Sequence, residues 1–135
     1  MVPTLPRTLL VDDDPTTNFL NRKLLEKMGF ADQVMVALNG RDALQILDKH
    51  CQDNSETCPS LLFLDVNMPL MDGFEFLTAY QKLSLAERNA IVIVMLTTSV
   101  HPRDLQRLEQ LPVAGFLSKP LTEDKVKQVL AENFN

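Results

Sequence analysis

The sequence lacks a long apolar run, an excess of positive charge and a secretory leader. No stretch approaches the roughly 20 consecutive apolar residues of a membrane-spanning helix, so we expect no membrane partner. A net charge of −5 and a pI near 4.9 argue against binding nucleic acid through a basic face. The opening segment MVPTLPRTLLV contains one arginine, two prolines and no signal-peptide core, which predicts a cytoplasmic protein.

Cysteine is also scarce, because the chain contains only Cys51 and Cys58, on either side of the polar stretch QDNSET. In a reducing cytosol such a pair usually remains as free thiols, which is what we expect here. A disulfide and a metal site that includes His50 are the alternatives. Three potential ligands without a paired spacing do not match a zinc site.

The 135 residues, 45% hydrophobic and 23% charged, fit one soluble globular domain without linkers or repeats. Short apolar runs alternate with amphipathic segments along the whole chain. The runs predict strands at 7–12, 33–37, 61–65, 90–97 and 113–118, and the amphipathic segments predict helices at 15–29, 39–50, 73–83, 102–111 and 122–132.

These apolar runs are continuous rather than alternating, as a parallel sheet covered on both faces requires. With right-handed crossovers, the predicted fold is a doubly wound α/β domain with five parallel strands and five helices on both faces. In the first helix, Leu20, Leu24 and Met28 recur at four-residue steps and predict its apolar face. Asn39 and Thr122 are predicted to cap the second and last helices.

Polar residues gather where the predicted strands end, and the segment LLFLDVNMPLMDG (61–73) shows this most clearly. In a doubly wound sheet, ligands bind beyond the carboxyl ends of the strands. The residues at this edge are Asp12, Asp13, Asp14, Asp65, Thr97 and Lys119. Singly, each has an ordinary explanation as a cap, a turn or a surface charge. Together, the acids repel one another unless Lys119 and a divalent cation lie between them, and hard oxygen ligands suit Mg²⁺ best.

Four motifs resemble those of one known family, the receiver domain of two-component response regulators. They are LLVDDDP (9–15), LFLDVNMPLMDG (62–73), VMLTTS (94–99) and GFLSKPL (115–121), and the resemblance covers about residues 7–133. The resemblance is to the stand-alone, single-domain type, similar to the bacterial chemotaxis response regulator. The resemblance implies a flavodoxin-like fold with strand order 2-1-3-4-5.

The resemblance also implies a role for each residue at the strand ends. Asp65 would be the phosphoacceptor. Asp12 and Asp13 would hold Mg²⁺, or Mn²⁺ as a substitute, together with Asp65 and the backbone carbonyl of Asn67. The family's hydroxyl position is Thr97, which would hydrogen-bond the phosphoryl group.

The family's ammonium position is Lys119, which would pair with the phosphoryl group. Phe116 matches the aromatic switch position, where a tyrosine is common, so a signal that needs the tyrosine hydroxyl is not expected. The surface that would change is formed by 102–111, 113–118 and 122–132.

The resemblance further implies a signalling domain rather than an enzyme acting on a separate substrate. Its phosphoryl donor would be a sensor histidine kinase or a histidine phosphotransfer protein, and its downstream protein target is unknown. Because the last predicted helix ends near residue 132, we expect one receiver domain over 1–135 and no output domain. The sequence leaves open whether the domain is a signal terminus or a relay intermediate.

Three alternatives fit less well. A haloacid-dehalogenase-type phosphatase needs an acid two residues after the nucleophile, where this chain has Asn67, and Thr or Val where it has Pro69. An amide cannot transfer the proton. A flavodoxin-like electron carrier would have to bind a flavin phosphate against the acidic DDDP loop. A degenerate receiver typically lacks an acid or the lysine, and this chain has the full set.

Overall fold

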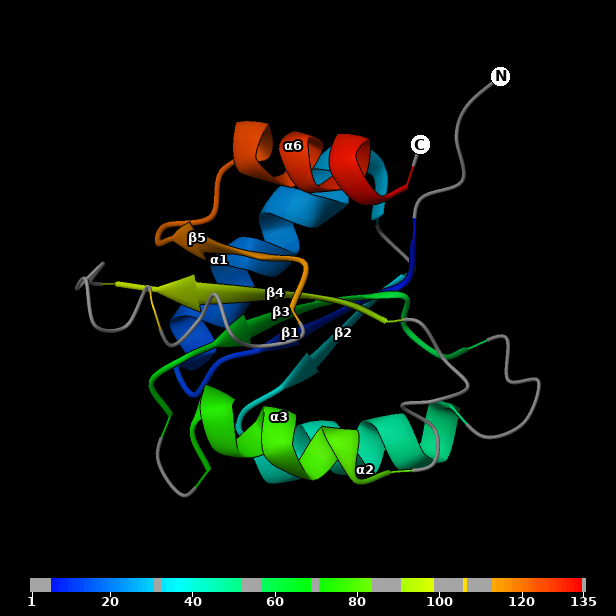
Figure 1. Ribbon diagram of the computed structural model, residues 1–135. Helices are drawn as coiled ribbons and strands as arrows, with labels where there is room; N and C mark the ends of the chain where they lie inside the picture. The colour runs from blue at the N-terminus through cyan, green and yellow to red at the C-terminus, as the bar shows by residue number, and fades with distance from the viewer. Residues whose placement is uncertain are drawn as a thin grey trace.

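The computed structural model describes residues 6–30, 33–51, 57–68, 71–83, 91–98, 106 and 113–134 (Figure 1). Its strands are β1 (Thr8–Val11), β2 (Val34–Ala37), β3 (Leu61–Asp65), β4 (Val92–Thr97) and β5 (Gly115–Ser118). Its helices are α1 (Pro15–Leu25), a π-helical turn (Glu26–Phe30), α2 (Gly40–His50), α3 (Gly73–Gln81) and α6 (Glu123–Asn133).

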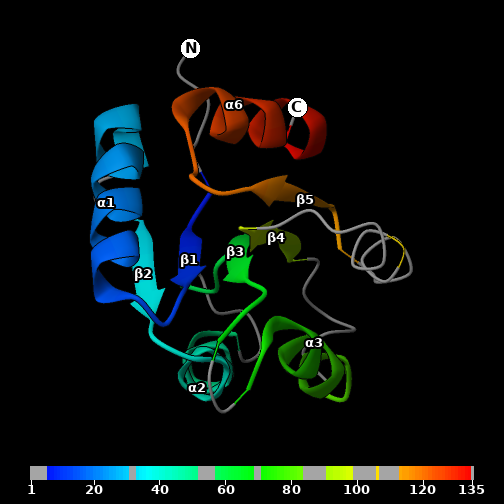
Figure 2. The same ribbon diagram turned by 90° about the vertical axis from the view of Figure 1, so that its left-hand side faces the viewer.

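All five strands are parallel and lie in the order β2-β1-β3-β4-β5. The sheet separates α1 and α6 on one face from α2 and α3 on the other, as Figure 2 shows from the side. The predicted doubly wound α/β fold and its strand order are therefore confirmed. The helix expected at 102–111 lies outside the described residues, apart from Gln106.

Two apolar clusters hold the helices on the sheet, and β3 contributes to both. Leu62 and Leu64 join the cluster that contains residues of α2 and α3, whereas Leu61 and Phe63 join the cluster that contains residues of α1 and α6. Every residue of β3, including Asp65, is buried. A strand that is buried on both faces holds its last residue firmly, and that residue is the acid singled out by the sequence.

Helix caps agree with the sequence at both predicted positions. The Asn39 side chain accepts a hydrogen bond from the Asp42 N–H at 2.8 Å, and the Thr122 hydroxyl accepts one from the Lys125 N–H at 3.3 Å. The structure adds a capping box before α3, where Asp72 and Glu75 each accept the other's backbone N–H. These caps fix where the helices begin after the strands that precede them.

The predicted apolar face of the first helix is correct in part. Leu24 and Met28 are partly buried and pack against the apolar cluster that contains residues of α1 and α6, whereas Leu20 is 60% exposed. The buried residues of α1 are Asn18, Asn21 and Leu25. Two of these are polar, and the Asn18 amide reaches its buried position by donating to the backbone carbonyls of Asp12, at 2.8 Å, and Ala37, at 3.4 Å. Hydropathy alone does not reveal a buried residue of this kind.

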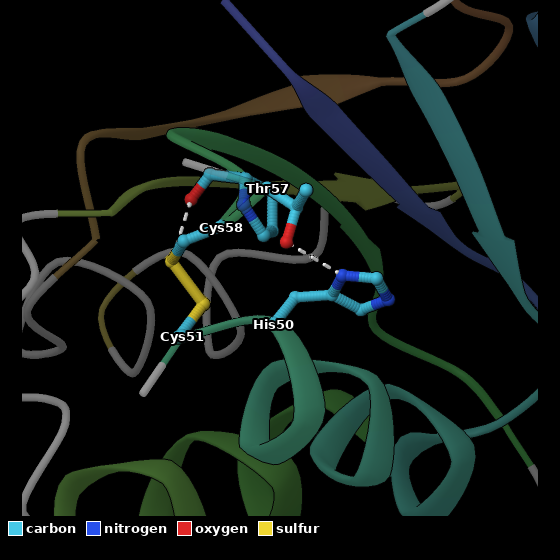
Figure 3. Close-up of a disulfide and its surroundings, with 5 residues drawn as sticks. His50, Cys51, Thr57 and Cys58 are labelled. Carbon is cyan, nitrogen blue, oxygen red and sulfur yellow. Dashed lines mark hydrogen bonds between the residues drawn. A yellow bond between two sulfur atoms is a disulfide. The ribbon is translucent and has the colours of Figure 1, made fainter. Parts of the chain in front are cut away.

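The expectation of free thiols is also wrong, because Cys51 and Cys58 form a disulfide (Figure 3). Cys51 caps the end of α2, and Cys58 lies three residues before β3. Helix and strand bring the two Cα atoms to 4.5 Å, within the range that a disulfide can span.

The described helices include none with the length and hydropathy needed to cross a membrane.

Candidate functional site

The carboxyl ends of the parallel strands bring together residues that lie far apart in the sequence. Asp12 directly follows β1, Asp65 ends β3 and Thr97 ends β4. The register pairs Asp65 with Leu96, so Thr97 lies one residue beyond the acid on the neighbouring strand. Lys119 directly follows β5, and its backbone N–H donates to the Thr97 carbonyl at 2.8 Å. The residues expected at the strand ends therefore lie along one edge of the sheet.

Three carboxylates form the acidic part of this site. One oxygen from each of Asp12, Asp13 and Asp65 lies within 4.8 Å of the others. Asp12 is 3% exposed and Asp65 4% exposed, whereas Asp13 faces solvent. Hard carboxylate oxygens at this spacing, two of them buried, fit a hard divalent cation such as Mg²⁺ that keeps open positions for water.

Lys119 provides the positive charge opposite the acids. Its Nζ lies 2.8 Å from Asp12 Oδ2 and 3.2 Å from Asp65 Oδ1, and its side chain is 18% exposed. Burial opposes the charge on the ammonium, but its hydrogen bonds and attraction to Asp12 and Asp65 outweigh burial and raise the pKa of Lys119. The lysine is therefore charged at neutral pH and held against both buried acids.

The Asp65 carboxyl is in an unfavourable place for a charge. Burial, and then repulsion by Asp12, raise its pKa from 3.8 to about 6, although Lys119 and the Asn67 N–H partly oppose this shift. The Asn67 N–H donates to Asp65 Oδ1 at 3.3 Å. One lysine thus does not fully compensate the buried acids, and further positive charge at the site would keep Asp65 ionised.

Asp12 and Asp14 have different hydrogen-bonding roles although they lie close together in the sequence. The Asp12 carboxylate accepts from the Asp14 N–H at 3.0 Å, and its carbonyl accepts from the buried Asn18 amide. Asp14 instead caps α1 by accepting from the Thr16 N–H and the Thr17 hydroxyl. The ordinary capping explanation therefore applies to Asp14. The Asn18 amide thus holds the backbone of Asp12, and no local pattern in the sequence indicates this contact.

Gly73 allows the loop after Asp65 to turn back against the strand end. Its N–H donates to the Val66 carbonyl at 2.9 Å. A Cβ at this position would lie 3.0 Å from the Asp65 carbonyl oxygen and 3.1 Å from the Val66 Cα. Both of these are backbone atoms, and displacing them would distort the strand end. Glycine is therefore required for this close approach.

Two predicted residues lie at the border of the site. Thr97 is 5% exposed at the end of β4. Phe116 lies in β5, where it is partly buried and pairs in register with Met95. It packs against the apolar cluster that contains residues of α2 and α3. Because side chains alternate along a strand, Thr97 lies on the same face of the sheet as Met95. The hydroxyl and the ring are therefore on one face, in adjacent strands.

A family model described as the response regulator receiver domain matches residues 8–131. The chain belongs to this family. Receiver domains take part in two-component signalling, and they are signalling domains rather than enzymes in the usual sense. The resemblance found in the four sequence motifs is thereby confirmed over nearly the whole chain.

Individual receiver domains and proteins are similar to this chain at about one third identity or slightly less. The probable methanogenesis regulatory protein FilR2 of Methanothrix harundinacea is 32% identical over 125 residues, which are 92% of this chain and 78% of that protein. The sensor histidine kinase RcsC of Salmonella typhi is 33% identical over 123 residues, 91% of this chain but only 12% of the kinase. The receiver therefore matches one small part of the kinase.

Solved structures show the same architecture. The chemotaxis protein CheY4 of Vibrio cholerae has a TM-score of 0.77 and 29% identity, with 95% of this chain and 98% of that chain covered. A two-component response regulator from Cytophaga hutchinsonii has a TM-score of 0.82 and 26% identity, with 93% of each chain covered. The fold described above is thus that of the family's known structures.

Proposed function

We propose that this receiver domain accepts a phosphoryl group on Asp65 from a phosphohistidine of a sensor histidine kinase or a histidine phosphotransfer protein. One observation carries the proposal. Asp65 is a buried carboxylate at the end of a rigid strand, in contact with Lys119 and within 4.8 Å of two further acids. An ordinary structural aspartate needs neither the extra acids nor burial at the edge where ligands bind.

The chemistry follows from the geometry of the residues present. An ionised Asp65 oxygen attacks the phosphorus atom, while the bond from phosphorus to the donor nitrogen breaks and its electron pair leaves with the donor. Charge then spreads over three phosphoryl oxygens. The Lys119 ammonium and the Thr97 hydroxyl, at the neighbouring strand ends, would stabilise that charge.

A divalent cation completes the proposed site. Mg²⁺, or Mn²⁺ as a substitute, would be held by Asp12, Asp13, Asp65 and the backbone carbonyl of Asn67, and when bound it would supply positive charge to the phosphoryl oxygens. The oxygen-only donor set supports a hard cation. Of the three acids, Asp13 is the one exposed to solvent.

The partner is proposed from the chemistry and from the relatives. Segments of RcsC from Salmonella typhi and of the sensor protein GacS from Pseudomonas syringae are each 33% identical to this chain. A receiver segment within sensor kinases supports a histidine kinase or a phosphotransfer protein as donor.

We further propose that the chain is a single cytoplasmic receiver domain with a core at about 7–133. It would modify only its own Asp65 and control a protein target.

Phosphorylation by a small molecule tests this function. Incubated with phosphoramidate and Mg²⁺, the parental protein should gain the mass of one phosphoryl group in an intact-mass spectrum. Asp65→Asn should gain none, because the amide is not a nucleophile here. Asp72→Asn is the matched control, since asparagine also caps a helix and Asp72 lies outside the acid cluster. Equal phosphorylation of the Asp65→Asn variant would refute the proposal.

We propose that phosphorylation also switches a surface. The new charge at Asp65 would draw Thr97 toward the phosphoryl group, and Phe116 would turn into the space that Thr97 leaves. The shared face of Thr97 and Phe116 on adjacent strands supports this coupling. The surface affected would comprise β5, α6 and residues 102–111, and a preference of a few kcal/mol would make the switched state dominant.

Amide NMR shifts on adding beryllofluoride and Mg²⁺ should report this switch. We expect large shifts around Asp65, around Thr97 and throughout residues 102–120, with small shifts across α1 beyond its first turn. The reason is that the proposed movement passes through β4 and β5 rather than through α1. Shifts confined to the immediate neighbours of Asp65 would contradict the switch and would make a relay role the better interpretation.

A further inference from the structure

No part of the proposed function uses the Cys51–Cys58 disulfide, which joins the end of α2 to the chain that precedes β3. Cys58 precedes the first residue of β3, whereas Asp65 is the last residue of that strand. The five residues of β3 span roughly 13 Å between these ends, at about 3.3 Å per residue. The disulfide is therefore a separate chemical feature at the opposite edge of the sheet.

The two sulfur-bearing residues differ in access. Cys51 is 1% exposed and belongs to the cluster between the sheet and α2 and α3. Cys58 is only partly buried, and its Sγ lies 3.6 Å from the Pro59 carbonyl oxygen at the edge of the same cluster. Thiol–disulfide exchange depends on which sulfur an attacking thiolate can reach. Of the two residues, Cys58 has the larger exposed surface, so we expect the attack at its Sγ.

A second contact holds the two ends of the loop together without the disulfide. A hydrogen bond of 2.9 Å joins His50 Nδ1 and Thr57 Oγ1, directly beside the disulfide and with the same separation in sequence (Figure 3). The Cys51 N–H also donates to the Leu47 carbonyl at 2.8 Å, which fixes Cys51 at the end of α2. With the disulfide open, both thiols would stay close, and such proximity favours its re-formation.

We propose that Cys51 and Cys58 form a reversible dithiol–disulfide modification site, reduced by dithiols and re-formed by small-molecule disulfides. A thiolate of the dithiol attacks Cys58 Sγ; a mixed disulfide forms there, and the electron pair of the broken S–S bond leaves on Cys51 Sγ, which takes up a proton. The second thiol then attacks the dithiol's own sulfur and releases Cys58, which is also protonated. The protein gains two electrons and two protons, and the dithiol becomes a disulfide.

Reduction of the disulfide removes a covalent link between the end of α2 and the chain just before β3. The link restricts the unfolded chain by closing a short loop, so its loss should lower the melting temperature by roughly 5 to 10 °C. The acids and Lys119 should keep their arrangement, because they are fixed at the other end of the strands. Redox state should thus change stability and leave the phosphoacceptor chemistry unchanged.

Mixed-disulfide trapping tests the order of attack. The native protein is treated with a limiting amount of reduced glutathione, quenched with acid and mapped by peptide mass spectrometry. Glutathione should be found on Cys58, and dithiothreitol followed by alkylation should label both cysteines together. Oxidised glutathione should then restore the disulfide in unalkylated protein. Three results would each overturn the proposal. Glutathione could be found on Cys51, the cysteines could be alkylated without any reduction, or the disulfide could fail to re-form.

Melting curves test the effect on stability. The parental protein should melt roughly 5 to 10 °C lower in dithiothreitol than without it. Cys58→Ala should melt at the same temperature in both buffers, because it cannot form the disulfide that dithiothreitol reduces. No change in the melting temperature of the parental protein would contradict the stabilising role.

Phosphorylation by phosphoramidate should proceed at the same rate in both redox states, and a loss on reduction would contradict the independence of the two sites.

Discussion

The Asp13→Asn variant should be phosphorylated by phosphoramidate at least about 100-fold more slowly than the parental protein in Mg²⁺. Asp13 contributes one of three carboxylate oxygens within 4.8 Å, and it is the solvent-exposed one. An amide offers a neutral oxygen in place of a charged one, so the affinity for a divalent cation falls. The measurement is the rate of phosphorylation by intact mass at several Mg²⁺ concentrations, and high Mg²⁺ should recover part of the lost rate.

Asp14→Asn is the control for this experiment. Asp14 is the next residue, is also exposed and caps α1, which asparagine can equally do. It does not belong to the acid cluster, so this variant should react at the parental rate. If Asp13→Asn is phosphorylated as fast as Asp14→Asn, the metal ligands have been assigned wrongly.

The Asp65→Asn variant should be more stable than the parental protein in EDTA at pH 7.5. Burial and repulsion by Asp12 raise the pKa of Asp65 from 3.8 to about 6, so the charged carboxylate destabilises the folded state at neutral pH. A neutral amide removes this cost, which is about 1 to 3 kcal/mol. We expect the melting temperature to rise by roughly 3 to 10 °C in differential scanning calorimetry.

The pH dependence follows from the sign of the shift. The folded protein holds the Asp65 proton more tightly than the unfolded chain, so its free energy of unfolding falls as pH rises from about 4 to about 6. The advantage of Asp65→Asn should therefore be largest above pH 7 and should shrink below pH 4. Asp48→Asn, on the exposed side of α2, should show little change. A lower melting temperature for Asp65→Asn at pH 7.5 would mark Asp65 as a structural acid.

The strands and their ends were predictable because burial on both faces leaves a local mark. Continuous apolar runs located all five strands to within two residues of the observed ends, and parallel topology then implied that Asp12, Asp65, Thr97 and Lys119 would share one edge. The backbone geometry of that edge follows from fold class alone. The motif around Asp65 could thus be recognised from sequence before any coordinates were known.

Features that depend on contacts between distant segments were not predictable. Asn18 is buried because its amide meets the carbonyls of Asp12 and Ala37, and nothing in the hydropathy of the first helix signals this. Likewise, Cys51 and Cys58 meet because α2 ends beside the start of β3. The sequence led us to expect Lys119 between the acids, whereas the particular oxygens it contacts, Asp12 Oδ2 and Asp65 Oδ1, are seen only in the side-chain geometry.

The position of the phosphoryl group in the chain tests the central claim most directly. The protein is phosphorylated with phosphoramidate and Mg²⁺ and then reduced with sodium borohydride, which converts an aspartyl phosphate into homoserine. Tandem mass spectrometry of the peptide containing LLFLDVNMPLMDG locates the change. The account predicts homoserine at position 65 and nowhere else. Homoserine at Asp12 or Asp13 instead, or phosphate only on a hydroxyl or histidine side chain, would contradict it.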